Sequence, residues 1–226
     1  TYTPTAWIAV ALPIFVVEGF FNLLTNVDIL IVGYFMQPDQ VAVYFAAART
    51  LALVHFVYFA VRAGSAHRFS QYYASGDRLR LRMFVRDSLH WTFWPSLALV
   101  LMLYAIGDKL LLLFGPGFAS GYPLLFILSI GILVRASIGP AESLLTMAGQ
   151  QGICAVIYTV TFVLNVLLNI ALIPRFGLFG AAIATSIALV LESIALYIVT
   201  YTRLGIHSFV FLAFRPVQAT EGRLNG

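Results

Sequence analysis

The sequence has 226 residues, of which 61% are hydrophobic and 10% are charged, and its formal net charge is +4. Soluble domains contain about 45–50% apolar and about 25% charged residues, so this composition excludes an ordinary soluble domain and indicates a chain that lies in lipid. The arginines flank apolar runs, as membrane-topology signals do, and we expect no nucleic-acid partner.

Six apolar segments are long enough to cross a bilayer, which takes about 20 residues. We predict spans at residues 7–36, 41–64, 90–106, 122–148, 153–173 and 178–201. The links between most of them are short, so neighbouring spans are expected to run antiparallel. The predicted fold is an all-α integral membrane protein, with a six-transmembrane-helix bundle over residues 1–204.

The first three spans carry local features that go beyond a plain apolar run. The first holds Pro13 and Gly19, where a long helix can bend. The second can continue past the membrane toward Tyr73. Before the third span, residues 77–87 alternate charged residues with Leu, Met and Phe. We expect this segment to lie in the membrane interface.

The fourth span is predicted as one helix and carries two charged residues. Arg135 and Glu142 are seven residues apart, so they share one face about 10.5 Å apart along the axis. That separation is too long for a direct pair, and we expect both to line a cavity. Between the last two spans, Pro174 and Gly177 predict a tight reversal. The small residues of 180–186 then allow close helix packing.

The arginines of the links predict the orientation. They lie between the second and third spans and in the C-terminal tail: Arg68, Arg78, Arg80, Arg82, Arg86, Arg203, Arg215 and Arg223. The opposite side has only Lys109 and Arg175. By the positive-inside rule, the arginine-rich link and the C-terminus are cytoplasmic. Residues 205–226 are expected to form an interfacial segment followed by a disordered cytoplasmic tail.

Several ionisable residues fall within the predicted spans. An ionisable side chain at mid-membrane costs at least about 2.5–3.5 kcal/mol, so such residues normally face a cavity or a partner. The candidates are Glu18, Asp28, Arg49, Arg62, Arg135, Glu142 and Glu192. We therefore expect few of them to face lipid.

Five short motifs occur in a fixed order: NVDILIVG at 26–33, VYFAAAR at 43–49, LFGPGF at 113–118, LIPRFG at 172–177 and GAAIAT at 180–185. In this order and spacing the chain resembles the polysaccharide (lipid-linked oligosaccharide) flippase family of the MOP (multidrug/oligosaccharidyl-lipid/polysaccharide) exporter superfamily. It is similar to the C-terminal six-helix half of those transporters.

The resemblance implies one lobe of a two-lobed transporter. An N-terminal six-helix half would then precede Thr1 or come from a second chain. One departure is His67, where related chains often have Pro. That difference bears on a kink at this position and not on the fold.

The implied function is transport without bond chemistry, so the protein is expected not to be an enzyme. It would move lipid-linked oligosaccharide across the bacterial inner (plasma) membrane, for cell-surface polysaccharide or lipopolysaccharide synthesis, by ion-coupled alternating access. Arg49, Arg62 and Arg135 would bind the lipid pyrophosphate, because guanidinium groups bind phosphate oxygens bidentately. The alternatives are snorkelling for Arg62, pairing of Arg49 with Asp28 or a headgroup, and a buried ion pair between Arg135 and another helix.

The resemblance also implies a coupling-ion site. In some superfamily members the positions matching Asp28, Asn165, Asn169 and Thr185 bind Na⁺, and oxygen ligands suit such a hard cation. An interhelical hydrogen-bond cluster of the same groups is the alternative. Carboxylates such as Glu18 and Glu142 could instead carry protons. We expect no other cofactor, since no phosphate-cradling loop or metal-ligand spacing occurs.

Two further functions stay open at this stage. A multidrug or cation antiporter of the same superfamily would use cavity acids to bind cationic drugs, although three intramembrane arginines argue against it. A membrane enzyme or a non-transporting scaffold of polysaccharide assembly comes from another class. A scaffold would not need the buried charges.

Overall fold

The computed structural model describes residues 11–12, 15, 19, 22–23 and 26–212. The elements are α2 (Val27–Phe35), α3 (Pro38–Ala74), α4 (Arg78–Leu112), the short 3₁₀ helix η1 (Pro116–Gly121), α5 (Tyr122–Ser137), α6 (Ala141–Met147), α7 (Gln151–Phe176) and α8 (Leu178–Leu204). The predicted first span is described only in part, and Pro13 and Glu18 lie outside the described residues.

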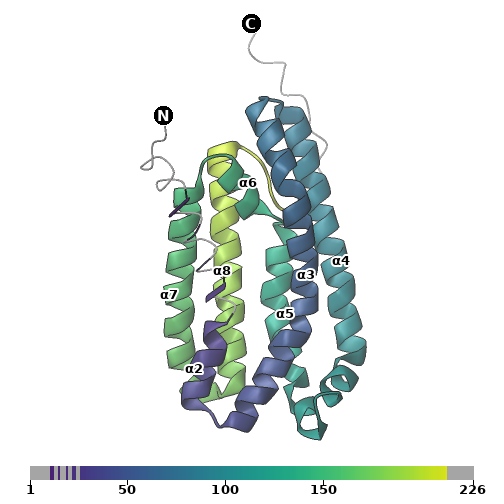
Figure 1. Cartoon of the computed structure of the whole chain (residues 1–226), viewed down its shortest axis with the longest axis vertical. Helices are drawn as coiled ribbons and strands as arrows, with labels where there is room; N and C mark the ends of the chain where they lie inside the picture. The colour runs from purple at the N-terminus through teal and green to yellow at the C-terminus, as the bar shows by residue number, and fades with distance from the viewer. Residues whose placement is uncertain (1–10, 13–14, 16–18, 20–21, 24–25, 213–226) are drawn as a thin grey trace, which may run out of the picture.

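The fold is an all-α membrane bundle, as predicted. Five helical segments are long and apolar enough to cross a membrane within the described residues: α3, α4, Pro116–Ser137, α7 and α8. In Figure 1, α2, α7 and α8 lie on one side of the bundle, and α3, α4 and α5 lie on the other. Contacts between α5 and α8 join the two sides. The candidate site lies along this junction.

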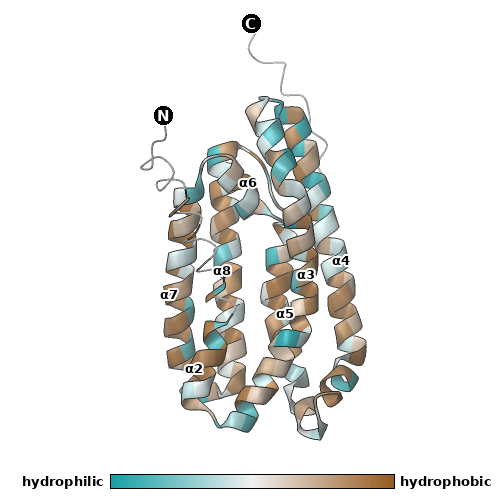
Figure 2. Ribbon diagram, viewed as in Figure 1, coloured by the Kyte–Doolittle hydropathy of each residue, from teal (hydrophilic) through white to brown (hydrophobic). Residues whose placement is uncertain are grey.

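The α3–α4 hairpin extends beyond the thickness of a membrane. With 37 residues α3 is about 55 Å long, whereas the hydrocarbon core measures about 30 Å. Figure 2 shows hydrophilic residues gathered at the upper ends of both helices. This end carries the arginine-rich link that the sequence places on the cytoplasmic side.

Residues 77–87, which we expect to lie in the membrane interface, form the beginning of α4. They are the N-terminal cap and first turns of α4, where the Arg80 N–H donates to Asp77 Oδ1 at 3.0 Å. Leu81, Phe84 and Val85 recur at helical spacing and pack in a cluster with Phe69 of α3, whereas Leu79 and Met83 are exposed. The Phe84 ring lies edge-on to Phe69, at 5.2 Å between centroids. Part of this segment therefore packs on another helix, and its place in the membrane interface stays a prediction.

The predicted fourth span is broken in its middle. Helix α5 ends at Ser137 and α6 begins at Ala141, and Gly139 between them has φ +55°. Pro140 has no N–H for the helical ladder and disfavours helical conformation in the residue before it. The expectation that Arg135 and Glu142 share one helical face is therefore wrong.

The segment after α8 folds back onto this break. We name residues 205–212 the C-terminal strap. The Val210 N–H donates to the Ser137 carbonyl, which α5 leaves free, at 2.9 Å. Ile206 and Val210 are buried against a cluster that includes Leu89. Part of the strap is thus packed against the bundle, and its position in the membrane interface stays a prediction.

Helices α7 and α8 pack backbone to backbone. Helix α7 continues through Pro174 to Phe176, so the reversal is shorter than predicted and is made at Gly177. A Cβ on Gly180 would lie 2.6 Å from the carbonyl carbon of Leu172. Only glycine fits there, and this supports the prediction that small residues allow close packing.

Candidate functional site

Two clusters of polar side chains lie inside the apolar bundle. The Arg135 cluster comprises Arg135, Glu192, Tyr58 and Tyr158, and the Asp28 cluster comprises Asp28, Tyr44 and Thr185. All seven residues are buried. Polar groups buried in an apolar bundle need hydrogen-bond partners, and each of the seven residues has one on another helix. Among the described residues, Glu192 Oε2 has no such partner.

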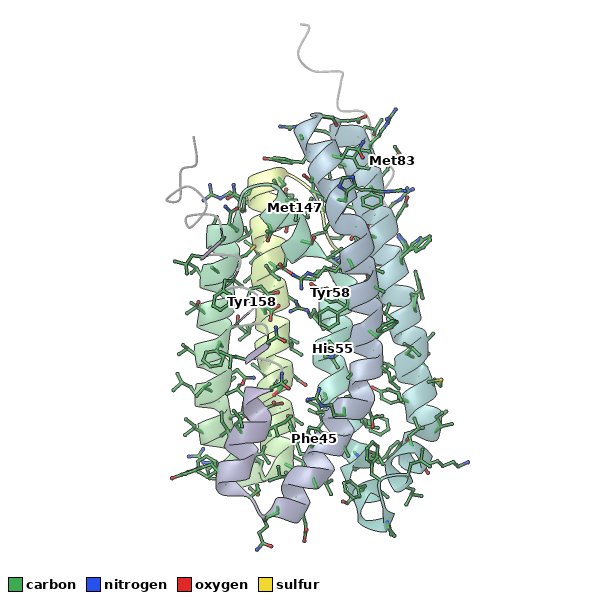
Figure 3. The ribbon with its side chains drawn as sticks, in the orientation of Figure 1. Phe45, His55, Tyr58, Met83, Met147 and Tyr158 are labelled. Carbon is green, nitrogen blue, oxygen red and sulfur yellow. The ribbon has the colours of Figure 1, made fainter. Side chains whose placement is uncertain are left out.

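The Arg135 cluster joins four helices through one guanidinium group. Arg135 on α5 forms an ion pair with Glu192 on α8. Its Nη2 donates to the Tyr158 hydroxyl on α7 at 2.8 Å and to the Tyr58 hydroxyl on α3 at 3.2 Å. The guanidinium carbon also lies 4.8 Å from the Tyr58 ring centroid. Figure 3 places Tyr58 and Tyr158 at the same level of the bundle.

A second ion pair links α3 to α6. Arg62 Nε lies 3.4 Å from Glu142 Oε2, and Arg62 Nη2 donates to Glu142 Oε1 at 3.4 Å. The two side chains are 18% and 4% exposed. Glu142 therefore has a cation from α3 as its partner. Two of the three predicted substrate arginines, Arg62 and Arg135, lie in ion pairs between helices.

The Asp28 cluster holds a buried carboxylate by three hydrogen bonds. Asp28 Oδ2 accepts from the Tyr44 hydroxyl at 2.6 Å and from Thr185 Oγ1 at 3.3 Å. Oδ1 accepts from the Ile29 N–H at 2.9 Å. The structure thus joins Asp28 and Thr185, two members of the predicted ion site, although 157 residues separate them.

The other two members, Asn165 and Asn169, form a pair of their own on α7. Asn169 Nδ2 donates to Asn165 Oδ1 at 3.0 Å and to its carbonyl at 2.9 Å. Both residues are fully buried. Among the described residues, Asn169 Oδ1 has no hydrogen-bond donor. Across that same part of the chain, no three His, Cys, Asp or Glu residues gather as metal ligands.

A cavity of about 300 Å³ lies beside the Asp28 cluster, among α2, α3, α5 and α8. Asp28, Thr185, Arg49 and His55 line it. Arg49 Nη2 donates to Asn26 Oδ1 at 3.4 Å, and the guanidinium lies 5.0 Å from the Phe45 ring centroid. Arg49 is therefore the predicted substrate arginine that borders this cavity.

Sequence reasoning missed the three tyrosines of these clusters. Tyr44, Tyr58 and Tyr158 lie in apolar segments, where a buried hydroxyl needs a partner, and that requirement was the available signal. It could not identify the partner, because each lies on another helix. Glu192 was singled out as ionisable, but no motif indicated that it would pair with Arg135.

Comparison with known proteins identifies relatives. The family model MatE matches residues 13–171. The chain is 26% identical over 173 residues to "Probable low-salt glycan biosynthesis flippase Agl15" of Haloferax volcanii, and 25% identical over 173 residues to "Probable flippase AglR" of the same organism. Each alignment covers 74% of this chain and 36% of the relative, so the chain spans about a third of their length. No solved structure matches.

Proposed function

This chain belongs to the MatE family of the MOP superfamily, and on that premise we propose that it is a flippase lobe that moves a lipid-linked oligosaccharide across the cytoplasmic membrane. The names of the two relatives support a flippase, and one of them refers to glycan biosynthesis. The protein would act by alternating access, without bond chemistry. Since the chain spans about a third of those relatives, an N-terminal half or a second chain would complete the transporter.

The observation that carries this proposal is the cavity bordered by both Arg49 and Asp28. A guanidinium in a membrane cavity offers planar, always-charged donors to pyrophosphate oxygens. We assign the first contact with the pyrophosphate to Arg49. Arg62 and Arg135 would bind phosphate only when it displaces the carboxylates of Glu142 and Glu192. These pairs are then the elements that exchange partners as the lobes rock.

We assign the coupling of transport to an ion gradient to the Asp28 cluster. A Na⁺ ion or a proton would bind the Asp28 carboxylate, with the Thr185 hydroxyl as a second oxygen. Asn165 and Asn169 would add amide oxygens if α7 moves relative to α2, against which it packs. Proton transfer through Glu142 or Glu18 is the alternative route.

The ion pairs also favour a second candidate function, a cation antiporter. Glu142 and Glu192 neutralise the charges of Arg62 and Arg135, so these two arginines would not repel a cationic drug. Among the described residues, the remaining positive charge beside the cavity is that of Arg49. The Asp28 carboxylate could bind such a drug. The two functions predict different sensitive residues. Loss of the Arg49 charge would abolish flipping, whereas loss of the Asp28 charge would abolish drug binding.

The distinguishing experiment uses the protein in proteoliposomes that contain lipid-linked oligosaccharide. Flipping is measured as the fraction of glycan accessible to an external glycosidase, and drug transport as the uptake of a fluorescent cation. We expect Arg49→Gln to slow flipping at least about tenfold, since a lost charged contact is worth about 1.4 kcal/mol or more. Arg175→Gln is the matched control, because Arg175 lies in the last turn of α7 and does not line the cavity. Flipping that survives Arg49→Gln overturns the assignment of the pyrophosphate contact to Arg49. Transport of the cation without flipping of the glycan overturns the flippase.

A further inference from the structure

A second concave site lies at the end of the bundle that carries the arginine-rich link. It is a cavity of about 330 Å³ where the ends of α3, α4 and α8 meet the C-terminal strap, and we name it the rim pocket. Arg78, Arg82 and Arg203 line it together with Tyr72, Leu81 and Ile206. We propose that the rim pocket binds a phosphate group at the membrane surface, apart from the cavity assigned to transport.

The three arginines reach the rim pocket from distant parts of the chain. Arg78 and Arg82 lie one turn apart on α4, whereas Arg203 lies in the last turn of α8. The strap fixes this arrangement, since Arg82 Nη2 donates to the Gly205 carbonyl at 3.5 Å. Only the tertiary fold therefore brings the positive charges together around one concave surface.

Within the part of the chain that the structure describes, the arginines of the rim pocket have no acidic partner, unlike their neighbours on α4. At the same end of α4, Arg80 pairs with Asp77 at 3.2 Å, and Arg86 pairs with Asp87 at 3.5 Å. Among the described residues, no carboxylate lines the rim pocket. Concentrated, uncompensated guanidinium groups favour an anion, and their planar donors suit phosphate oxygens in particular.

The depth of the rim pocket matches that of lipid phosphates. Helix α8 has 27 residues and is about 40 Å long, close to the 40–45 Å of a bilayer with its headgroups. Arg203 in its last turn then lies at headgroup level. Leu81 and Ile206 are buried and form an apolar floor beneath the arginines. A phosphate carried by an anionic lipid fits this combination, and a soluble phosphate ester would use the same donors.

The test measures binding by the full protein in nanodiscs. One arm titrates fluorescent phosphatidylglycerol into phosphatidylcholine nanodiscs, and the other titrates inorganic phosphate by calorimetry. The variant is Arg78→Gln with Arg82→Gln. The control, Arg80→Gln with Arg86→Gln, removes the same charge from the same helix outside the rim pocket. Since the variant removes specific charge-assisted hydrogen bonds to the phosphate, we expect it to weaken binding at least about tenfold more than the control does.

Two outcomes support the site and identify the source of the phosphate, and two others overturn the proposal. Saturable phosphatidylglycerol binding that the variant loses and the control keeps supports the site and assigns a lipid. Saturable binding of inorganic phosphate with the same selectivity supports the site and assigns a soluble ligand. Equal weakening by both double variants overturns the proposal, because it would reflect general surface charge. Absence of saturable binding in both arms overturns it as well.

Discussion

Arg135 and Glu192 form an ion pair between α5 and α8, although 57 residues separate them in the sequence. Their side chains are 3% and 0% exposed. Since α5 and α8 join the two sides of the bundle, this pair lies at the structural junction. The tyrosines on α3 and α7 extend the junction to two more helices.

Breaking this pair by one substitution is expected to destabilise the protein strongly. Arg135→Gln or Glu192→Gln leaves a buried charge without its counter-ion, which costs about 3–5 kcal/mol. The free energy of unfolding, measured by SDS titration in mixed micelles, tests this. The double variant, Arg135→Gln with Glu192→Gln, removes both charges and is expected to recover most of the loss. A double variant as unstable as the sum of the singles contradicts the pairing.

Two variants of the Asp28 cluster are expected to affect different properties, one the stability of the protein and the other the ion dependence of transport. Tyr44→Phe removes one hydrogen bond to the carboxylate and is expected to cost about 1 kcal/mol, as membrane-interior hydrogen bonds do, while transport stays ion-dependent. Asp28→Asn preserves the shape of the side chain but removes its charge, so it is expected to abolish ion dependence. Transport measured against a Na⁺ or proton gradient checks both variants. Unchanged dependence in Asp28→Asn excludes the carboxylate as the coupling group.

The break between α5 and α6 makes Gly139 intolerant of a side chain. Gly139→Ala places a Cβ 2.9 Å from Leu89 Cδ2 at a backbone φ of +55°. The left-handed conformation costs about 1–2 kcal/mol and the overlap about 1–3 kcal/mol. Gly149→Ala is the control, because its φ is +77° but nothing lies within 4 Å of the added Cβ. Unfolding titrations should rank Gly139→Ala as clearly the more destabilising, and equal losses would exclude the overlap with Leu89.

Close packing of α7 on α8 predicts a large effect at Gly180. Gly180→Ala would bring a Cβ within 2.9 Å of the Ile173 nitrogen, which belongs to the backbone and cannot rotate away. We expect α7 and α8 to separate and the protein to lose at least about 1–3 kcal/mol. Gly64→Ala in α3 meets nothing within 4 Å and should be neutral or slightly stabilising. Melting curves in detergent compare the two, and equal curves would contradict the close approach at Gly180.

The elements were largely predictable because each depends on local composition. The run 178–201 is apolar over more than the thickness of a membrane, and it forms α8. The Gly139-Pro140 pair was also visible, yet the apolar run around it favoured one continuous helix. For residues 77–87 the structure adds what the sequence could not show, namely that they begin α4 and pack partly on α3. Their apolar spacing fits both an interface and a neighbouring helix, so only the position of α3 shows which side chains it covers.

The site was predictable as a list of unusual residues and not as a set of pairs. The cost of a charge in lipid singled out Asp28, Arg62, Arg135, Glu142 and Glu192, since each needs a partner there. By itself the sequence therefore determined an all-helical membrane bundle. It also determined which residues carry charges that need a partner inside that bundle. Only the tertiary structure decided that Arg135 pairs with Glu192 and Arg62 with Glu142. Which helices lie side by side depends on packing between segments far apart in the chain.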